Sequence, residues 1–132
     1  MVDFNWYIEK DIPFVEKGRD ESGLDCWGLV QLFYKREYDK NLPDYTAVYE
    51  NTKDLRIAKT IIDQKEKHWK EVKTPKEGDV ILCRMNNHPM HVGIYKDGGF
   101  MLHIEKGNNA SIENINGLKW KRRILGIYRL SM

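Results

Sequence analysis

The sequence is poor in cysteine and proline and has no strong excess of either charge. Its 132 residues include two cysteines and four prolines, and the formal net charge is only +2. A charge so close to balance gives no case for nucleic acid as a partner. No apolar run approaches the roughly 20 residues that a membrane-spanning helix needs, so we expect no membrane span.

The first ten residues also lack the features of a secretion signal. Met1–Lys10 mixes acidic and aromatic side chains, whereas a signal peptide has a basic start and an apolar centre. We therefore expect a protein made in the cytoplasm without a signal peptide. Because disulfides are uncommon in that compartment, Cys26 and Cys83 are expected to be free thiols.

Helical periodicity is confined to the first half of the chain. The apolar residues Cys26, Leu29, Val30 and Phe33 have the spacing of one helix face and predict a helix from Cys26 to about Tyr38. A second helix is expected over about 52–67. Residues 1–25 are expected to be irregular because glycine and proline interrupt them.

The second half contains short apolar runs separated by turns. These runs predict strands over 80–83, 91–95, 100–105, 110–115 and 123–130. Helices followed by a series of strands indicate an α+β fold with an antiparallel sheet. The chain is 41% hydrophobic, enough for one core, so residues 1–132 are expected to form a single domain.

Cys26 is the first candidate for chemistry because it opens the first predicted helix. Asp25 precedes it and is suited to cap the helix. Unpaired N–H groups and the helix dipole favour an anion at this end, which lowers a thiol's pKa and makes it a better nucleophile. Gly28 is expected to leave the first turn open to a substrate. The alternative is that Cys26 is an inert residue of the apolar face.

His91 and His103 are the candidates for a base and its partner. A nucleophilic thiol needs a base, and the base needs a polar group that holds its ring in one tautomer. A three-residue hairpin loop, Asp97–Gly99, would place both histidines on one face of the sheet as diagonal neighbours. His91 could instead be a structural histidine of its strand.

These residues resemble the motifs of the NlpC/P60 cysteine peptidases. Residues 23–30 (GLDCWGLV) resemble that family's nucleophile motif, residues 91–95 (HVGIY) its histidine strand, and His103 stands at its third polar position. The stretch 13–30 and the ending 124–129 resemble the branch found in phage and prophage tail proteins.

The resemblance implies a papain-like fold in which N-terminal helices pack on an antiparallel sheet. It implies a Cys26–His91–His103 triad that hydrolyses peptide-stem bonds of bacterial peptidoglycan without a cofactor. It also implies that the stem peptides of peptidoglycan are its partners. Phage tail-tip proteins are a further implied partner, and the virion is a further implied location.

Two neighbours of the nucleophile are candidates for substrate binding. By the resemblance, Asp25 binds a substrate amine, beside its capping role. Trp27 replaces the serine that many relatives carry, as a substrate platform or as packing. Phe14 lacks the hydroxyl of the tyrosine that many relatives have there, and Tyr7 is an unproven substitute.

Three other functions compete with a wall peptidase. The first is a non-catalytic tail assembly protein on the same fold, and the second is a thiol amidase or acyltransferase with a non-wall substrate. The third, a zinc site, is disfavoured because the sequence has no CxxC and no HExxH spacing. Its ligands would come from Cys26, Cys83, His88, His91 and His103.

Overall fold

The structure of the protein is a computed structural model that describes residues 2–43, 69–85 and 88–131. The helix expected over 52–67 lies outside these residues. The described elements are α1 (Phe4–Glu9), β1 (Arg19–Asp20), β2 (Gly23–Leu24), α2 (Cys26–Tyr38), β3 (Trp69–Glu71), β4 (Val80–Met85), β5 (His88–Lys96), β6 (Phe100–His103), β7 (Ser111–Asn114) and β8 (Ile124–Leu130). Within the described residues, no helix combines the length and apolar character required to cross a membrane.

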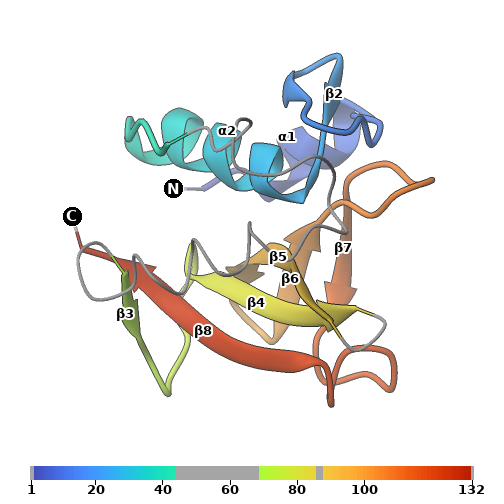
Figure 1. Ribbon diagram of the computed structural model, residues 1–132. Coiled ribbons are helices and arrows are strands. Elements are labelled where there is room, and N and C mark those ends of the chain that lie inside the picture. Colours follow the sequence, from blue (N-terminus) through green and yellow to red (C-terminus); the bar gives the residue numbers. More distant parts are fainter. Residues whose placement is uncertain (1, 44–68, 86–87, 132) are drawn as a thin grey trace.

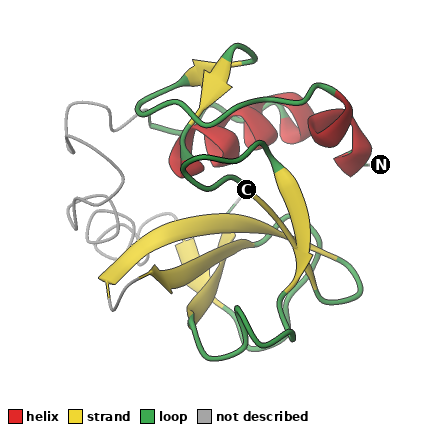
Figure 2. Ribbon diagram, turned by 90° about the vertical axis from the view of Figure 1, so that its right-hand side faces the viewer, coloured by secondary structure: helices red, strands yellow, loops and turns green. Residues whose placement is uncertain are grey.

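The main sheet is antiparallel and has six strands. Their spatial order is β3-β8-β4-β5-β6-β7, so the histidine-bearing strands β5 and β6 are neighbours. Both helices lie on one side of this curved sheet (Figures 1 and 2). The arrangement confirms the predicted α+β class.

Helix α2 has the bounds that the periodicity predicted. Asp25 caps its first turn by accepting a hydrogen bond from the N–H of Gly28. Leu29, Val30 and Phe33 are fully buried and pack in one core with Val92 and Ile94 of β5. This apolar face therefore fixes the start of α2 against the middle of the sheet.

Helix α1 contradicts the expectation that residues 1–25 are irregular. It has only six residues, too few for a helical period to stand out. Asp3 caps it, and Phe4 and Tyr7, three positions apart, supply its buried face. Tyr7 is the more deeply buried, and its hydroxyl donates to Glu37 of α2 at 2.6 Å.

The β5–β6 hairpin has the predicted three-residue loop. Lys96 pairs with Phe100, and both Gly98 and Gly99 have positive φ, 98° and 89°. This register places His91 and His103 on one face of the sheet. Gly93 lies on that face as well, where a Cβ would stand 2.5 Å from the Met101 side chain.

Other strand limits differ from the predictions. Strand β5 begins at His88, in a segment expected to be a break, and pairs there with Met85. Strand β6 ends at His103 instead of Glu105. The short strands β1, β2 and β3 were not predicted, since two or three residues give no readable alternation.

The first turn of α2 is closed where the sequence suggested an opening. Gly28 is buried, and a Cβ at this position would stand 2.2 Å from the backbone oxygen of Gly18. The absence of a side chain at Gly28 therefore admits the Gly18 carbonyl to the helix start, and the expected substrate access at this point is wrong.

Replacing Gly28 with alanine should therefore destabilise the fold. The clash is with backbone, which yields little, so we expect the Gly28→Ala change to lower the free energy of unfolding by about 1–3 kcal/mol. Lys35→Ala, in an exposed position of the same helix, should change it by less than about 0.5 kcal/mol. Urea unfolding followed by tryptophan fluorescence measures both, and equal stability of the two variants would contradict this packing.

Candidate active site

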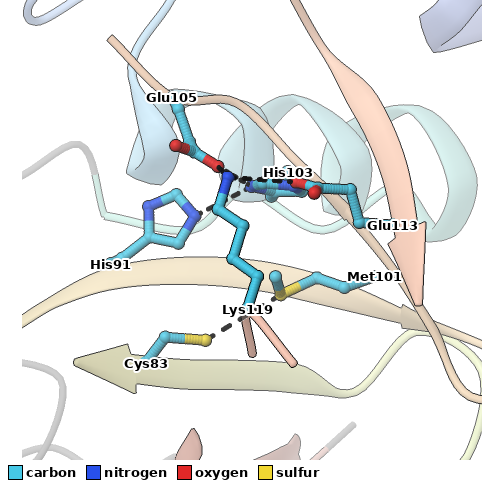
Figure 3. Close-up of polar contacts among 7 residues, drawn as sticks. All are labelled: Cys83, His91, Met101, His103, Glu105, Glu113 and Lys119. Atoms are coloured by element: carbon cyan, nitrogen blue, oxygen red, sulfur yellow. Dashed lines mark hydrogen bonds and ion pairs between the residues drawn. The ribbon is translucent and has the colours of Figure 1, made fainter. Parts of the chain in front are cut away.

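The two histidines predicted to act together are in direct contact. Nε2 of His91 lies 3.0 Å from Nδ1 of His103, and both side chains are buried. The rings meet edge to face, with centroids 5.2 Å apart. Figure 3 shows His91 reaching from β5 toward His103 on β6. The hairpin register thus produces the contact.

Cys26 lies against the same stretch of β5. The side chain is only 2% exposed, and the backbone N–H of Val92, next to His91, hydrogen-bonds to the thiol. The Cys26 thiol therefore contacts the strand residue that directly follows His91. The catalytic contact between Sγ of Cys26 and His91 remains a prediction.

Burial disfavours the charged forms of both Cys26 and His91. Burial, with the nearby Asp25 charge adding to the effect, raises the pKa of the Cys26 thiol to about 12. Burial, with His103 and Lys119 adding to the effect, lowers the pKa of His91 to about 3. Removal from water thus acts against the lowered thiol pKa that the helix start favours, because it disfavours charge on both groups.

The His103 ring has a second partner that the sequence analysis missed. Its Nε2 is hydrogen-bonded to Oε2 of Glu113 on β7. Burial lowers the pKa of His103, while the charges of Glu113 and Glu105 act in the opposite direction. No sequence motif marks Glu113; only the β6–β7 register, which pairs His103 with Ser111, brings it near.

Trp120 was also missed, and it forms one wall of the histidine pair. Its ring stacks on His91 with an interplanar angle of 16° and meets His103 edge to face. Trp120 is 1% exposed, and its indole N–H has no partner within the described part of the chain. The stacked ring restricts the imidazole of His91 to one plane.

Lys119, Glu105 and Glu113 form a cluster of ion pairs beside the His103 ring. Lys119 lies 2.6 Å from Glu105 and 3.8 Å from Glu113 (Figure 3). His103, Glu105 and Glu113 have the spacing of a metal site, and within residues 2–43, 69–85 and 88–131 no other group of this kind is found. Lys119 already balances the carboxylates, and the group contains neither cysteine of the disfavoured zinc set.

The structure accounts for Asp25 and Trp27 without a substrate. The Asp25 carboxylate is fully buried and accepts from the N–H groups of Gly28 and Lys17 and from Arg19. The Trp27 ring is 1% exposed, and its indole donates to the Pro43 carbonyl at 2.8 Å. These contacts favour capping and packing, and a buried Trp27 ring offers no exposed face as a platform.

The position of Tyr7 does not favour it as a substitute for the tyrosine that many relatives carry upstream of the nucleophile. Its hydroxyl is held by Glu37, near the opposite end of α2 from Cys26. Phe14 is half-buried and forms a bridge with Leu24, just before the helix.

The sequence matches the NlpC/P60 family over residues 11–129. The chain belongs to the NlpC/P60 family. Murein DD-endopeptidase MepS/Murein LD-carboxypeptidase of Escherichia coli K12 is 26% identical over 114 residues, 86% of this chain and 53% of the relative. Tail tip assembly protein K of Escherichia phage N15 is 25% identical over 129 residues, 90% of this chain and 50% of the relative. The chain thus spans about half the length of these relatives.

Solved structures of family members share the fold. The NlpC/p60 domain of peptidoglycan hydrolase SagA superposes with a TM-score of 0.61 at 19% identity, covering 99% of this chain and all of that one. An NLP/P60 family protein of Staphylococcus aureus Mu50, described as similar to lipoprotein, gives a TM-score of 0.68, also at 19% identity. That match covers 98% of this chain and 41% of the other.

The raised thiol pKa predicts slow alkylation of Cys26 at neutral pH. Only the thiolate reacts, so the iodoacetamide rate should rise about tenfold per pH unit from pH 7 to 10 without levelling off. The measurement uses the Cys83→Ala variant, in which Cys26 is the one remaining cysteine. This is necessary because burial also raises the pKa of Cys83 to about 12, so the two thiols would show the same pH dependence. Free glutathione serves as the reference thiol. A rate that is already constant below pH 8 would instead show a resting thiolate and contradict this account.

Proposed function

We propose that this protein is a cysteine peptidase that hydrolyses peptide-stem bonds of bacterial peptidoglycan. Cys26 is the nucleophile, His91 the general base and then acid, and His103 the residue that orients His91. The observation that carries the proposal is the 3.0 Å contact between Nε2 of His91 and Nδ1 of His103, beside the strand residue that the Cys26 thiol contacts.

The contact supports different tasks for the two nitrogens of His91. Nε2 is directed at His103, which leaves Nδ1 to take the proton of the Cys26 thiol. The sulfur then attacks the carbonyl carbon of the scissile amide, and the C–N bond breaks as His91 returns the proton to the leaving amine. Water hydrolyses the resulting thioester with His91 again acting as base.

The surroundings of the thiol favour charge only during the reaction. Cys26 is the first residue of α2, where the helix dipole stabilises negative charge on the sulfur or on the substrate oxygen. The stacked Trp120 ring stabilises positive charge on His91. Because burial disfavours charge on both groups, proton transfer is expected to accompany substrate binding.

The relatives support the substrate class. MepS is named a murein endopeptidase and SagA a peptidoglycan hydrolase, so the stem peptide is the substrate that we propose here. Hydrolysis of an amide by this triad requires no cofactor. A thiol amidase or acyltransferase with a non-wall substrate would use the same residues and would differ in its products.

A second candidate function is a role in phage tail assembly. The similarity to a tail tip assembly protein extends over 129 residues, a longer stretch than that shared with MepS. This observation favours tail-tip proteins as partners and the virion as a location. The role can accompany catalysis or replace it.

Removal of the nucleophile should abolish cleavage without loss of the fold. We expect purified muropeptides to be cut by the wild type and by Cys83→Ala, but not by Cys26→Ala. The two cysteines form a matched pair, since both are buried and burial raises the pKa of each to about 12. Mass spectrometry of the products identifies the bond, and circular dichroism verifies the fold.

The possible outcomes separate the candidates. Cleavage that persists in Cys26→Ala, or that disappears in a folded Cys83→Ala, would refute the choice of nucleophile. A folded wild type that cuts no muropeptide would favour the assembly role or a non-wall substrate.

A further inference from the structure

We infer that Glu113 is a positioning residue that sets the tautomers of both active-site histidines, so that the triad has a fourth member. This inference rests on the proposed function for its catalytic consequence. The inference is based on the hydrogen-bond chain Glu113–His103–His91 (Figure 3). It would explain why the edge strand β7 carries an acidic side chain at this position.

The argument begins with the chemistry of a carboxylate. An ionised Glu113 only accepts hydrogen bonds, whereas each nitrogen of a neutral imidazole either donates or accepts. Because Nε2 of His103 faces the Glu113 oxygen, that nitrogen must carry the proton. Its other nitrogen, Nδ1, then has a lone pair and must accept.

The same logic passes to the next ring. Nδ1 of His103 accepts from Nε2 of His91, 3.0 Å away, so Nε2 of His91 carries that ring's proton. The remaining nitrogen, Nδ1 of His91, is therefore unprotonated, as a base for the Cys26 thiol requires. One carboxylate on β7 thus sets the basic nitrogen on β5, two strands away.

The opposite arrangement would disable the base. If Nδ1 of His103 held the proton, it would donate to Nε2 of His91 and leave Nδ1 of His91 protonated. Nε2 of His103 would then face the Glu113 oxygen with two acceptors in contact, which is unfavourable. Glu113 excludes this state, and an uncharged apolar side chain would not.

Glu113 also stabilises the charged state of the pair. When His91 takes up the thiol proton at Nδ1, it still donates from Nε2 to His103, and no second proton moves. The charged groups around the rings are Glu113 of β7, Glu105 after β6 and Lys119 before β8. Of these, only Glu113 is hydrogen-bonded to His103, because Glu105 lies 3.8 Å from it.

Glu105 therefore provides a matched control. Both acids line the same pocket of about 520 Å³, and both lie near Lys119. Glu105→Gln removes a charge from this cluster without touching the hydrogen-bond chain. Glu113→Leu removes the acceptor, and Glu113→Gln keeps an acceptor but adds a donor, so it should give an intermediate effect.

The direct test reads the ring protons by NMR. The chain has four histidines, so ¹⁵N-histidine labelling with long-range proton–nitrogen correlation reports each tautomer, and single His→Gln variants assign them. We expect the wild type and Glu105→Gln to carry the proton on Nε2 of both His91 and His103. Glu113→Leu should show a mixture of tautomers at both rings.

Kinetics on muropeptides test the catalytic consequence. Glu113→Leu should lower kcat/KM by about 10-fold to 10⁴-fold. The lower limit is typical of the loss of an outer hydrogen-bond partner, and the upper limit is typical of a histidine fixed in the wrong tautomer. The loss should fall on kcat, and the acid limb of the pH profile should move to lower pH because a negative charge near the imidazolium is gone. Glu105→Gln should change kcat/KM by less than about 5-fold, the range of an exposed ion pair.

The two readouts fail in different ways. A wild-type His103 protonated on Nδ1, or tautomers that Glu113→Leu leaves unchanged, would overturn the role of Glu113 whether or not the protein is an enzyme. If the wild type cuts no muropeptide, the proposed function fails, while the NMR result still decides whether Glu113 sets the tautomers.

Discussion

The hydrogen bond between His91 and His103 is the contact on which the site depends. It joins two buried rings on neighbouring strands, and it forms because a three-residue loop fixes the register of β5 and β6. A loop one residue shorter would turn the two rings to opposite faces of the sheet. The fold therefore converts a local turn preference, the positive φ of Gly98 and Gly99, into the orientation of the proposed catalytic base, His91.

Burial strengthens this hydrogen bond and also disfavours charge on the groups around it. In a region shielded from water, the hydrogen bonds of His91 and His103 are strong and Trp120 holds one ring in plane. The same shielding raises the pKa of Cys26 and lowers that of His91, so it disfavours charge on either group. In the proposed mechanism, charge separation is therefore expected to accompany substrate binding.

The sequence predicted the parts of the site that short-range rules control. Helix α2 and its Asp25 cap follow from helical spacing, and the β5–β6 hairpin follows from its glycine-rich loop. Glu113 and Trp120 were not predictable in this way. Each reaches the histidines through a longer connection, the loop before β7 or the turn before β8, whose length does not specify a register. The openness of Gly28 was misjudged because the Gly18 carbonyl that fills it arrives from a separate segment.

The most direct test of the account is to identify the residue that attacks a substrate carbonyl. Stem peptides in which a chloromethyl ketone replaces the scissile amide would alkylate the nucleophile, and peptide mapping by mass spectrometry would locate the adduct. The account predicts one adduct, on Cys26, formed far more slowly when His91 is replaced by alanine. An adduct on Cys83, or labelling of Cys26 at the same rate without His91, would contradict it.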